Sequence, residues 1–226
     1  REAGSNAIEE LAFTMSNAIE YINTAKNKGL DINQFGEQIS FFFNSHNNFF
    51  EEISKFRAAR VLWARIMKEK FNVSNPKAMM CKFHTQTAGS TLQAQQVENN
   101  IVRTTLQAAA AVLGGTQSLH TNSYDEALSL PTQESAQIAL RTQQIIAYES
   151  GITNAIDPLA GSYYVETLTD TIIKKSWELM TEIENLGGAI EAIHNQFQEN
   201  RITESALNYQ QDIDSKLKII VGLNKF

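Results

Sequence analysis

The feature that most constrains the fold is a weak repeat of three short apolar segments, each followed by polar residues and then by a helix. Strands are predicted over residues 39–43, 78–83 and 116–119. They begin about 37–40 residues apart, a spacing that suits strand–loop–helix units. Strands joined in this way are parallel and connected by right-handed crossovers. The sequence therefore predicts an α/β fold with three neighbouring parallel strands.

Apolar periodicity and capping residues predict the helices around these strands. Region 1–155 is expected to carry the strands with their helices, and region 156–226 a helical extension packed on them. The predicted helices cover residues 7–22 (capped by Ser5), 49–67, 99–113 (capped by Asn99), 132–146 (capped by Thr132), 164–186 and 189–197, and a last strand is predicted over 217–222.

Charge and cysteine content narrow the class of protein. The chain of 226 residues has Lys+Arg 19 against Asp+Glu 25, a net charge of −6, with no basic run. This composition argues against a nucleic-acid or membrane-surface partner, and the apolar runs are too short to cross a bilayer. The single Cys81 cannot form an internal disulfide, which favours a reducing compartment. We predict a cytoplasmic protein with no nucleic-acid or membrane partner.

Each predicted strand leads into a polar cluster that contains a histidine. In parallel α/β folds, ligands bind at the carboxyl ends of the strands, so three successive clusters are candidates for a site. Taken one at a time, each cluster is explained better by loop entry or helix capping than by ligand binding. Phenylalanines 41–43 are predicted to be core, and arginines 57, 60 and 65 a solvated face. The clusters are Asn44-Ser45-His46, His84-Thr85-Gln86 and His120-Thr121-Asn122.

Two hydrolase classes compete as explanations of these clusters. His46, His84 and His120 could supply three imidazoles to zinc, but the clusters contain no carboxylate that could act as a general base. A serine hydrolase is less favoured, because the chain has no Gly-x-Ser-x-Gly turn. The acidic pair Asp125-Glu126 could accept hydrogen bonds from ligand hydroxyls or simply place charge near a helix start.

Longer sequence motifs identify a protein family more specifically than these clusters do. They closely resemble the large, catalytic subunit of the methylmalonyl-CoA mutase and adenosylcobalamin-dependent acyl-CoA mutase family, and the likeness covers nearly the whole chain. The motifs are Ser-Phe-Phe-Phe at 40–43, Phe-Arg-Ala-Ala-Arg at 56–60, Phe-His-Thr-Gln-Thr-Ala-Gly at 83–89, Asn-Asn-Ile-Val-Arg-Thr at 99–104, Gly-Gly-Thr-Gln-Ser-Leu-His-Thr-Asn at 114–122, Asp-Glu-Ala-Leu at 125–128, and Asp-Pro-Leu at 157–159 with Gly-Ser-Tyr at 161–163.

This resemblance implies the carboxyl-terminal half of a TIM barrel plus the helical extension, with coenzyme A threaded through the barrel and the corrin over its carboxyl-end face. It implies an isomerase that uses adenosylcobalamin for a radical 1,2-rearrangement of an acyl-CoA. The default reaction is the interconversion of (R)-methylmalonyl-CoA and succinyl-CoA. The alternatives are a 2-hydroxyisobutyryl-CoA or isobutyryl-CoA mutase, or a non-catalytic mutase-like subunit.

The resemblance also implies roles for individual residues. Ser40 matches a serine that contacts coenzyme A at the end of the first strand, and Gln38 stands where the family has arginine, so the charge is lost. Ser129 stands where alanine is usual. The implied substrate-binding residues are Gln38, Ser40, His84, Gln86 and Gln117, and the implied cofactor-binding residues are Gly89, Glu126 and Ser129.

Two family motifs are not found in these residues. The Tyr-His pair that assists the radical shift precedes the Glu-Ala-Gly that stands here at residues 2–4, so no catalytic residue is expected in this chain. The Asp-x-His-x-x-Gly signature of the cobalamin-binding domain is absent too. The expected partners are therefore the rest of the barrel and a cobalamin-binding domain or small subunit on another chain or segment. Alone, the chain is expected to be inactive, with an exposed sheet edge and low stability.

Overall fold

The computed structural model describes residues 1–226 and contains one small sheet. Its strands are β1 (Phe41–Ser45), β2 (Phe83–Thr87) and β3 (Ser118–His120), in the order β1-β2-β3, and both pairings are parallel. The predicted α/β fold with three neighbouring parallel strands is confirmed. The sheet is open, because β1 and β3 each have one edge that pairs with no other strand of the chain. Closure into a barrel therefore stays a prediction.

Helices make up most of the chain, and each strand is followed by one. None of them combines the length and apolar character that a membrane span requires. The helices are α1 (Ala7–Asn27), α2 (Ile32–Phe35), α3 (Phe49–Arg65), α4 (Asn99–Leu113), α5 (Gln133–Tyr148), α6 (Tyr163–Asn185), α7 (Ala189–His194) and α8 (Phe197–Asp214), with short helical turns η1 (Gly36–Gln38), η2 (Ile66–Lys70), η3 (Gly89–Thr91) and η4 (Ile152–Asn154).

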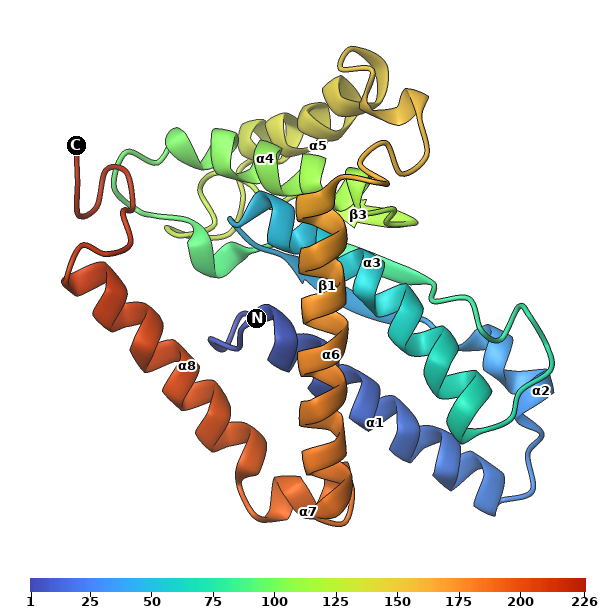
Figure 1. Ribbon diagram of the computed structural model, residues 1–226. Coiled ribbons are helices and arrows are strands. Elements are labelled where there is room, and N and C mark those ends of the chain that lie inside the picture. The colour runs from blue at the N-terminus through green and yellow to red at the C-terminus, as the bar shows by residue number, and fades with distance from the viewer.

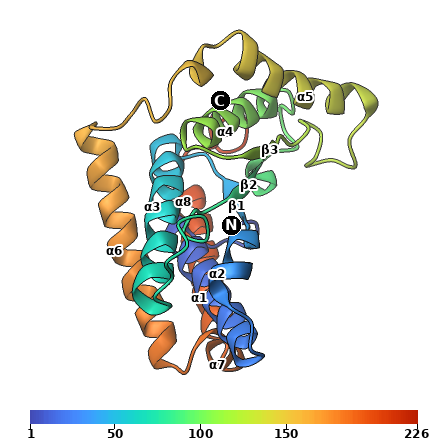
Figure 2. The same ribbon diagram turned by 90° about the vertical axis from the view of Figure 1, so that its right-hand side faces the viewer.

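The core lies where α1, α3 and α6 meet one face of the sheet. Figure 1 shows α6 crossing α3 and α1, and Figure 2 shows α3 and α6 side by side. Aromatic side chains fill the centre: the ring of Phe56 on α3 stacks on Phe83 of β2 at 5.3 Å, and Phe43 meets Phe83 at 5.4 Å. Buried residues of α6, such as Leu179 and Ile183, belong to the same core. The extension 156–226 thus shares its apolar core with region 1–155.

Capping explains where two helices begin. The Asn6 side chain accepts hydrogen bonds from the backbone N–H groups of Ile8 and Glu9, and Glu9 reaches back to the Asn6 N–H, which completes a capping box. Thr132 caps α5, as predicted. The predicted cap Ser5 is wrong by one residue. Asn99 is the first residue of α4 rather than its cap, and its side chain donates to Gln96 instead.

All three strands lie closer to the carboxyl end of the chain than predicted. Residues 78–82 do not form the start of β2. Ala78 is instead buried in the core, where its carbonyl accepts a hydrogen bond from Trp63 Nε1 at 3.0 Å, whereas Met80 is 61% exposed. All three polar clusters begin inside the strands. Ser45 is buried there because its hydroxyl donates to the Gln107 carbonyl at 2.8 Å.

Two of the three arginines predicted as a solvated face of α3 are partly buried against other elements. Arg57 is 12% exposed and pairs with Asp157 and with Glu166, so it ties the α5–α6 connection to α3. Arg60 donates to the Gly114 carbonyl at the end of α4. The prediction was wrong for both, because the helix face that they occupy packs against other elements rather than facing water. Arg65 is exposed.

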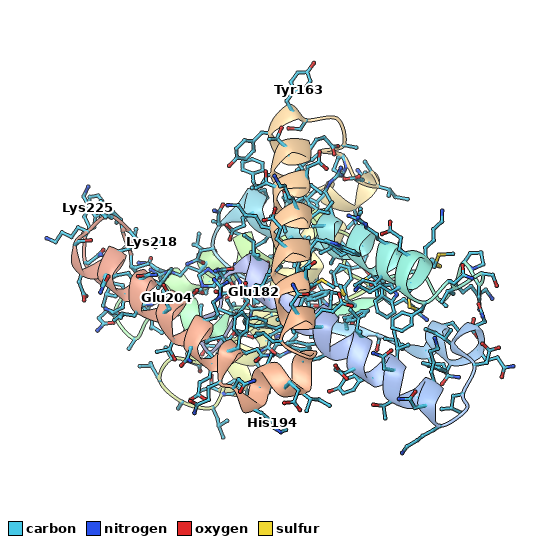
Figure 3. The ribbon with its side chains drawn as sticks, turned by 60° about the horizontal axis from the view of Figure 1, so that its bottom comes forward. Tyr163, Glu182, His194, Glu204, Lys218 and Lys225 are labelled. Carbon is cyan, nitrogen blue, oxygen red and sulfur yellow. The ribbon has the colours of Figure 1, made fainter.

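The carboxyl-terminal region differs most from the prediction. The helix predicted over 189–197 ends at His194, and α8, which was not predicted, begins at Phe197. No strand forms over 217–222; Val221 makes only an isolated bridge to Lys225. Figure 1 shows α8 running along one side of the molecule, and Figure 3 shows Tyr163 at the far end of α6 projecting away from it.

Candidate functional site

One face of the sheet presents side chains that are partly exposed to solvent. Along β2, Phe83, Thr85 and Thr87 are buried, whereas His84 and Gln86 are partly exposed, as the two-residue alternation of a strand requires. The strand register aligns two rows of side chains across this open face. The first row is Phe42, His84 and Ser118, and the second is Asn44, Gln86 and His120.

The first row combines an aromatic ring with a hydrogen bond between a histidine and a serine. His84 Nδ1 lies 2.7 Å from Ser118 Oγ, and the His84 ring lies 5.4 Å from the ring of Phe42. Phe42 is 55% exposed. The prediction that Phe42 is core was therefore wrong, because alternation along β1 buries only its neighbours Phe41 and Phe43.

The second row is built from amides. Gln86 Nε2 donates to Asn122 Oδ1 at 3.0 Å, and the Asn122 side chain is fixed in turn by its donation to the Thr87 carbonyl at 2.9 Å. Asn44 donates through Nδ2 to Glu2 at 2.7 Å, which leaves its buried Oδ1 without a partner. Partial burial and the neighbouring His84 lower the pKa of His120, so this row is uncharged at neutral pH.

Three of the predicted residues gather at the carboxyl edge of the open face. Gly89 lies against Glu126: a Cβ atom on Gly89 would be 2.5 Å from Glu126 Oε1 and 3.1 Å from Asn122 Nδ2. Partial burial, together with the charges of Glu2 and Asp125, raises the pKa of Glu126. Ser129 is exposed beyond it. A cavity of about 570 Å³ opens here, lined by residues that include Gln86, His120, Glu126 and Ser129.

Three other predicted residues lie at the opposite end of the strands, where the strands begin; this end is called the amino edge, and the end where they finish is called the carboxyl edge. Gln38 ends the turn η1 and Ser40 directly precedes β1, so Ser40 is at the start of the strand rather than at its end. Gln117 precedes β3; its Oε1 accepts the Phe83 N–H at 2.6 Å and its Nε2 donates to Gly115 O. The predicted site residues therefore divide between the two edges of one face, with His84 and Gln86 between them.

Some candidates lie away from this face. His46 follows β1 and lies in a separate cavity beside Arg1 and Tyr209, where burial and the Arg1 charge lower its pKa to about 4. No three His, Cys, Asp or Glu side chains of the chain converge as metal ligands. Asp125 is buried and accepts the Thr132 N–H at 3.2 Å, so it supports the start of α5 rather than facing a ligand.

Sequence reasoning overlooked two charged groups next to the site. The carboxylate of Glu2 contacts Asn44 and the backbone N–H groups of Gly89 and Ser90. Lys55 is fully buried under β1 and bonds the Asn44 carbonyl. Lys55 could have been found from the sequence, because it is a lysine on the apolar face of a predicted helix. For Glu2 the only indication was its place in the Glu-Ala-Gly motif at residues 2–4.

Comparison with known proteins gives a consistent result along the whole chain. The family model described as Methylmalonyl-CoA mutase matches residues 1–226. The 2-hydroxyisobutanoyl-CoA mutase large subunit of Aquincola tertiaricarbonis is 48% identical over 225 residues, which are 100% of this chain and 40% of the relative.

Relatives that carry the family's own name are as similar. Methylmalonyl-CoA mutase of Rhizobium meliloti (strain 1021) is 49% identical over 226 residues, and the mitochondrial enzyme of Homo sapiens is 47% identical. All of this chain aligns with 32% and 30% of these two proteins. The chain thus spans less than half the length of each of these relatives. It belongs to the methylmalonyl-CoA mutase family.

Proposed function

We propose that the protein containing this chain is an adenosylcobalamin-dependent acyl-CoA mutase, an isomerase that rearranges the carbon skeleton of an acyl thioester. The observation that carries the proposal is the open face itself. The side chains of His84 and Gln86 lie between two groups of polar residues, one at each end of the strands. A long, thin ligand with different chemistry at its two ends suits such a path.

The amino edge would hold the coenzyme A portion of the substrate. Gln38 and Ser40 are exposed there and have free hydrogen-bonding groups, and Gln117 is fixed by its bonds to the backbone. Gln38 carries no charge, so it can donate to a phosphate or an amide but adds no Coulomb attraction. The acyl thioester would then lie over His84 and Gln86.

The carboxyl edge would hold adenosylcobalamin, and its residues fit that group. The absence of a side chain at Gly89 lets Glu126 pack directly against the backbone there, and the exposed carboxylate of Glu126 can accept hydrogen bonds from ribose hydroxyls. Ser129 lies beside them. When bound, adenosylcobalamin would supply the radical chemistry of the reaction.

The protein's own contribution under this proposal is positioning and the exclusion of water. The hydrogen bonds of His84 to Ser118 and of Gln86 to Asn122 hold these side chains in fixed orientations. Neutral donors and acceptors can orient a thioester without offering a charged group that would divert the chemistry. The open face meets this need.

The relatives leave two substrate classes open. One relative named for 2-hydroxyisobutanoyl-CoA and one named for methylmalonyl-CoA are 48% and 49% identical to the chain. We propose methylmalonyl-CoA as the substrate, with 2-hydroxyisobutyryl-CoA and isobutyryl-CoA as the alternatives. The proposed partners are the remaining barrel strands, which would cover the free edges of β1 and β3, and a cobalamin-binding domain or small subunit. We retain 1–155 and 156–226 as the proposed domain division.

The test is an isomerisation assay on the full-length protein together with its cobalamin-binding domain or subunit. With adenosylcobalamin present, we expect conversion of one of the three thioesters, and the appearance of cob(II)alamin when that substrate is added. Bound cofactor without conversion of any of them would contradict the proposal.

A variant links this activity to the described site. Replacing Glu126→Ala removes the carboxylate at the carboxyl edge, so we expect weaker binding of adenosylcobalamin by about tenfold. Glu134→Ala, at an exposed position at the start of α5, is the matched control. Unchanged cofactor affinity and turnover in Glu126→Ala would remove this residue from the site.

A further inference from the structure

Glu2 links the carboxyl ends of the paired strands β1 and β2, in addition to the backbone hydrogen bond from the Ala88 N–H to the Ser45 carbonyl. Its Oε1 accepts hydrogen bonds from Asn44 Nδ2 at 2.7 Å and from the Gly89 N–H at 3.0 Å, and its Oε2 accepts the Ser90 N–H at 2.8 Å. Asn44 belongs to the end of β1, whereas Gly89 and Ser90 open the turn η3 after β2. Hydrogen bonds to a carboxylate are shorter and stronger than those between neutral groups.

The turn held in this way forms one wall of the carboxyl edge. The Gly89 backbone approaches Glu126 so closely that a Cβ atom could not fit between them, and Asn122, which holds Gln86, lies at the same place. A shift of the turn would therefore change the space beside Glu126. Neither N–H group of the turn has another partner among the residues of the chain, so nothing else replaces the Glu2 carboxylate.

We propose that Glu2 is a positioning residue for the cofactor edge of the site. Its carboxylate fastens the Gly89-Ser90 turn to Asn44, sets the gap between Gly89 and Glu126, and fixes the orientation of the Asn44 amide. Only the identity of the ligand at this edge, adenosylcobalamin, rests on the proposed function; the fastening itself follows from the hydrogen bonds.

The first test needs no cofactor. Amide hydrogen exchange is measured for Gly89 and Ser90 in the full-length protein, in the wild type and in three variants. Glu2→Ala removes all three acceptor contacts, so we expect exchange of both amides to accelerate about tenfold or more. Glu2→Gln keeps one acceptor oxygen and is expected to give an intermediate result. Glu51→Gln is the matched control, because Glu51 lies on the same side near Arg1 and contacts neither Asn44 nor the turn.

The second test separates positioning from general damage. We expect Glu2→Ala to weaken adenosylcobalamin binding in a spectroscopic titration by about tenfold, with the KM for the acyl-CoA changed by less than twofold. If Glu2→Ala does not fold, Glu2→Gln decides the question by the same two measurements.

Unchanged exchange at Gly89 and Ser90 would overturn the proposal, and so would an equal loss of cofactor and thioester affinity. A wild-type protein that isomerises no acyl-CoA would instead contradict the proposed function, while the exchange rates would still decide whether Glu2 fastens the turn.

Discussion

Lys55 is a lysine without any exposed surface, and its ammonium is the centre of a buried charged cluster. It donates to Glu10, to Glu52 and to the carbonyl of Asn44, and Arg1 pairs with the same two carboxylates. Burial acts to raise the pKa of Glu52, but Lys55 and Arg1 outweigh it and lower that pKa to about 2. Glu52 therefore stays ionised, and the cluster holds the end of β1 against α1 and α3.

Removal of the Lys55 ammonium should destabilise the folded protein. Replacing Lys55→Met leaves two buried carboxylates with one cation, so we expect a loss of about 3–5 kcal/mol in the free energy of unfolding. The measurement is urea unfolding, with Lys68→Met at an exposed position as the control, for which we expect a change within about 0.5 kcal/mol. A loss below about 1 kcal/mol for Lys55→Met would show that the cluster does not hold the strand.

His46 predicts how stability depends on pH. Its pKa falls from the ordinary 6.5 to about 4 because of burial and the neighbouring Arg1. Below pH 6.5 the His46 imidazole is protonated in the unfolded chain but stays unprotonated in the folded chain until the pH approaches 4. The free energy of unfolding should therefore decrease as the pH falls from 6.5 towards 4. Between pH 6.5 and 5 we expect a loss of about 1–2 kcal/mol.

Thermal or urea unfolding of His46→Gln over the same pH range checks this expectation. The variant should lose much less stability between pH 6.5 and 5 than the wild type, whereas His194→Gln, at an exposed site on α7, should behave like the wild type. An unaltered pH dependence in His46→Gln would assign the effect to other groups.

At the scale of elements, the sequence predicted those that bury an apolar stripe and missed those that do not. α1, α3 and α6 were found because their buried residues recur every three or four positions. α8 contains no buried residue. Ile202, Tyr209 and Ile213 do recur at helical spacing, but they are only partly buried, and this stripe was overlooked. The second strand was displaced because Ala78 and Cys81 pack into the hydrophobic core outside the strand, a tertiary effect that local pattern does not contain.

The site was predictable to a similar degree. His84, Gln86, Gly89 and Glu126 share one face because parallel strands align their ends, which the repeat already indicated. The contacts of Glu2 were not predictable, because they join residues 42 and more positions apart in sequence.

The polar character of α8 carries its own prediction. The helix touches the body through few side chains, such as Ser205 against Glu9 and Tyr209 against His46. Because helices depend on tertiary packing for most of their stability, we expect the amides of α8 to exchange at least tenfold faster than those of α6. Equal protection of the two helices in the full-length protein would contradict this and show that α8 is covered by another part of the protein.

At the scale of the whole molecule, the open sheet is the decisive feature. The free edges of β1 and β3 expose backbone groups that would pair with further strands. A complete barrel of this type has about 250 residues and eight strands. We therefore expect residues 1–226 alone to isomerise no acyl-CoA and to be prone to association. The full-length protein should isomerise an acyl-CoA and should not associate through these edges. Isomerase assays and light scattering on both proteins compare them directly.

The most direct measurement is an experimental structure of the full-length protein with adenosylcobalamin and an acyl-CoA. We predict coenzyme A at the Ser40 and Gln117 edge, the thioester over His84 and Gln86, and the cofactor against Gly89 and Glu126. A thioester bound elsewhere, with His84 and Gln86 covered by other parts of the protein, would contradict this prediction.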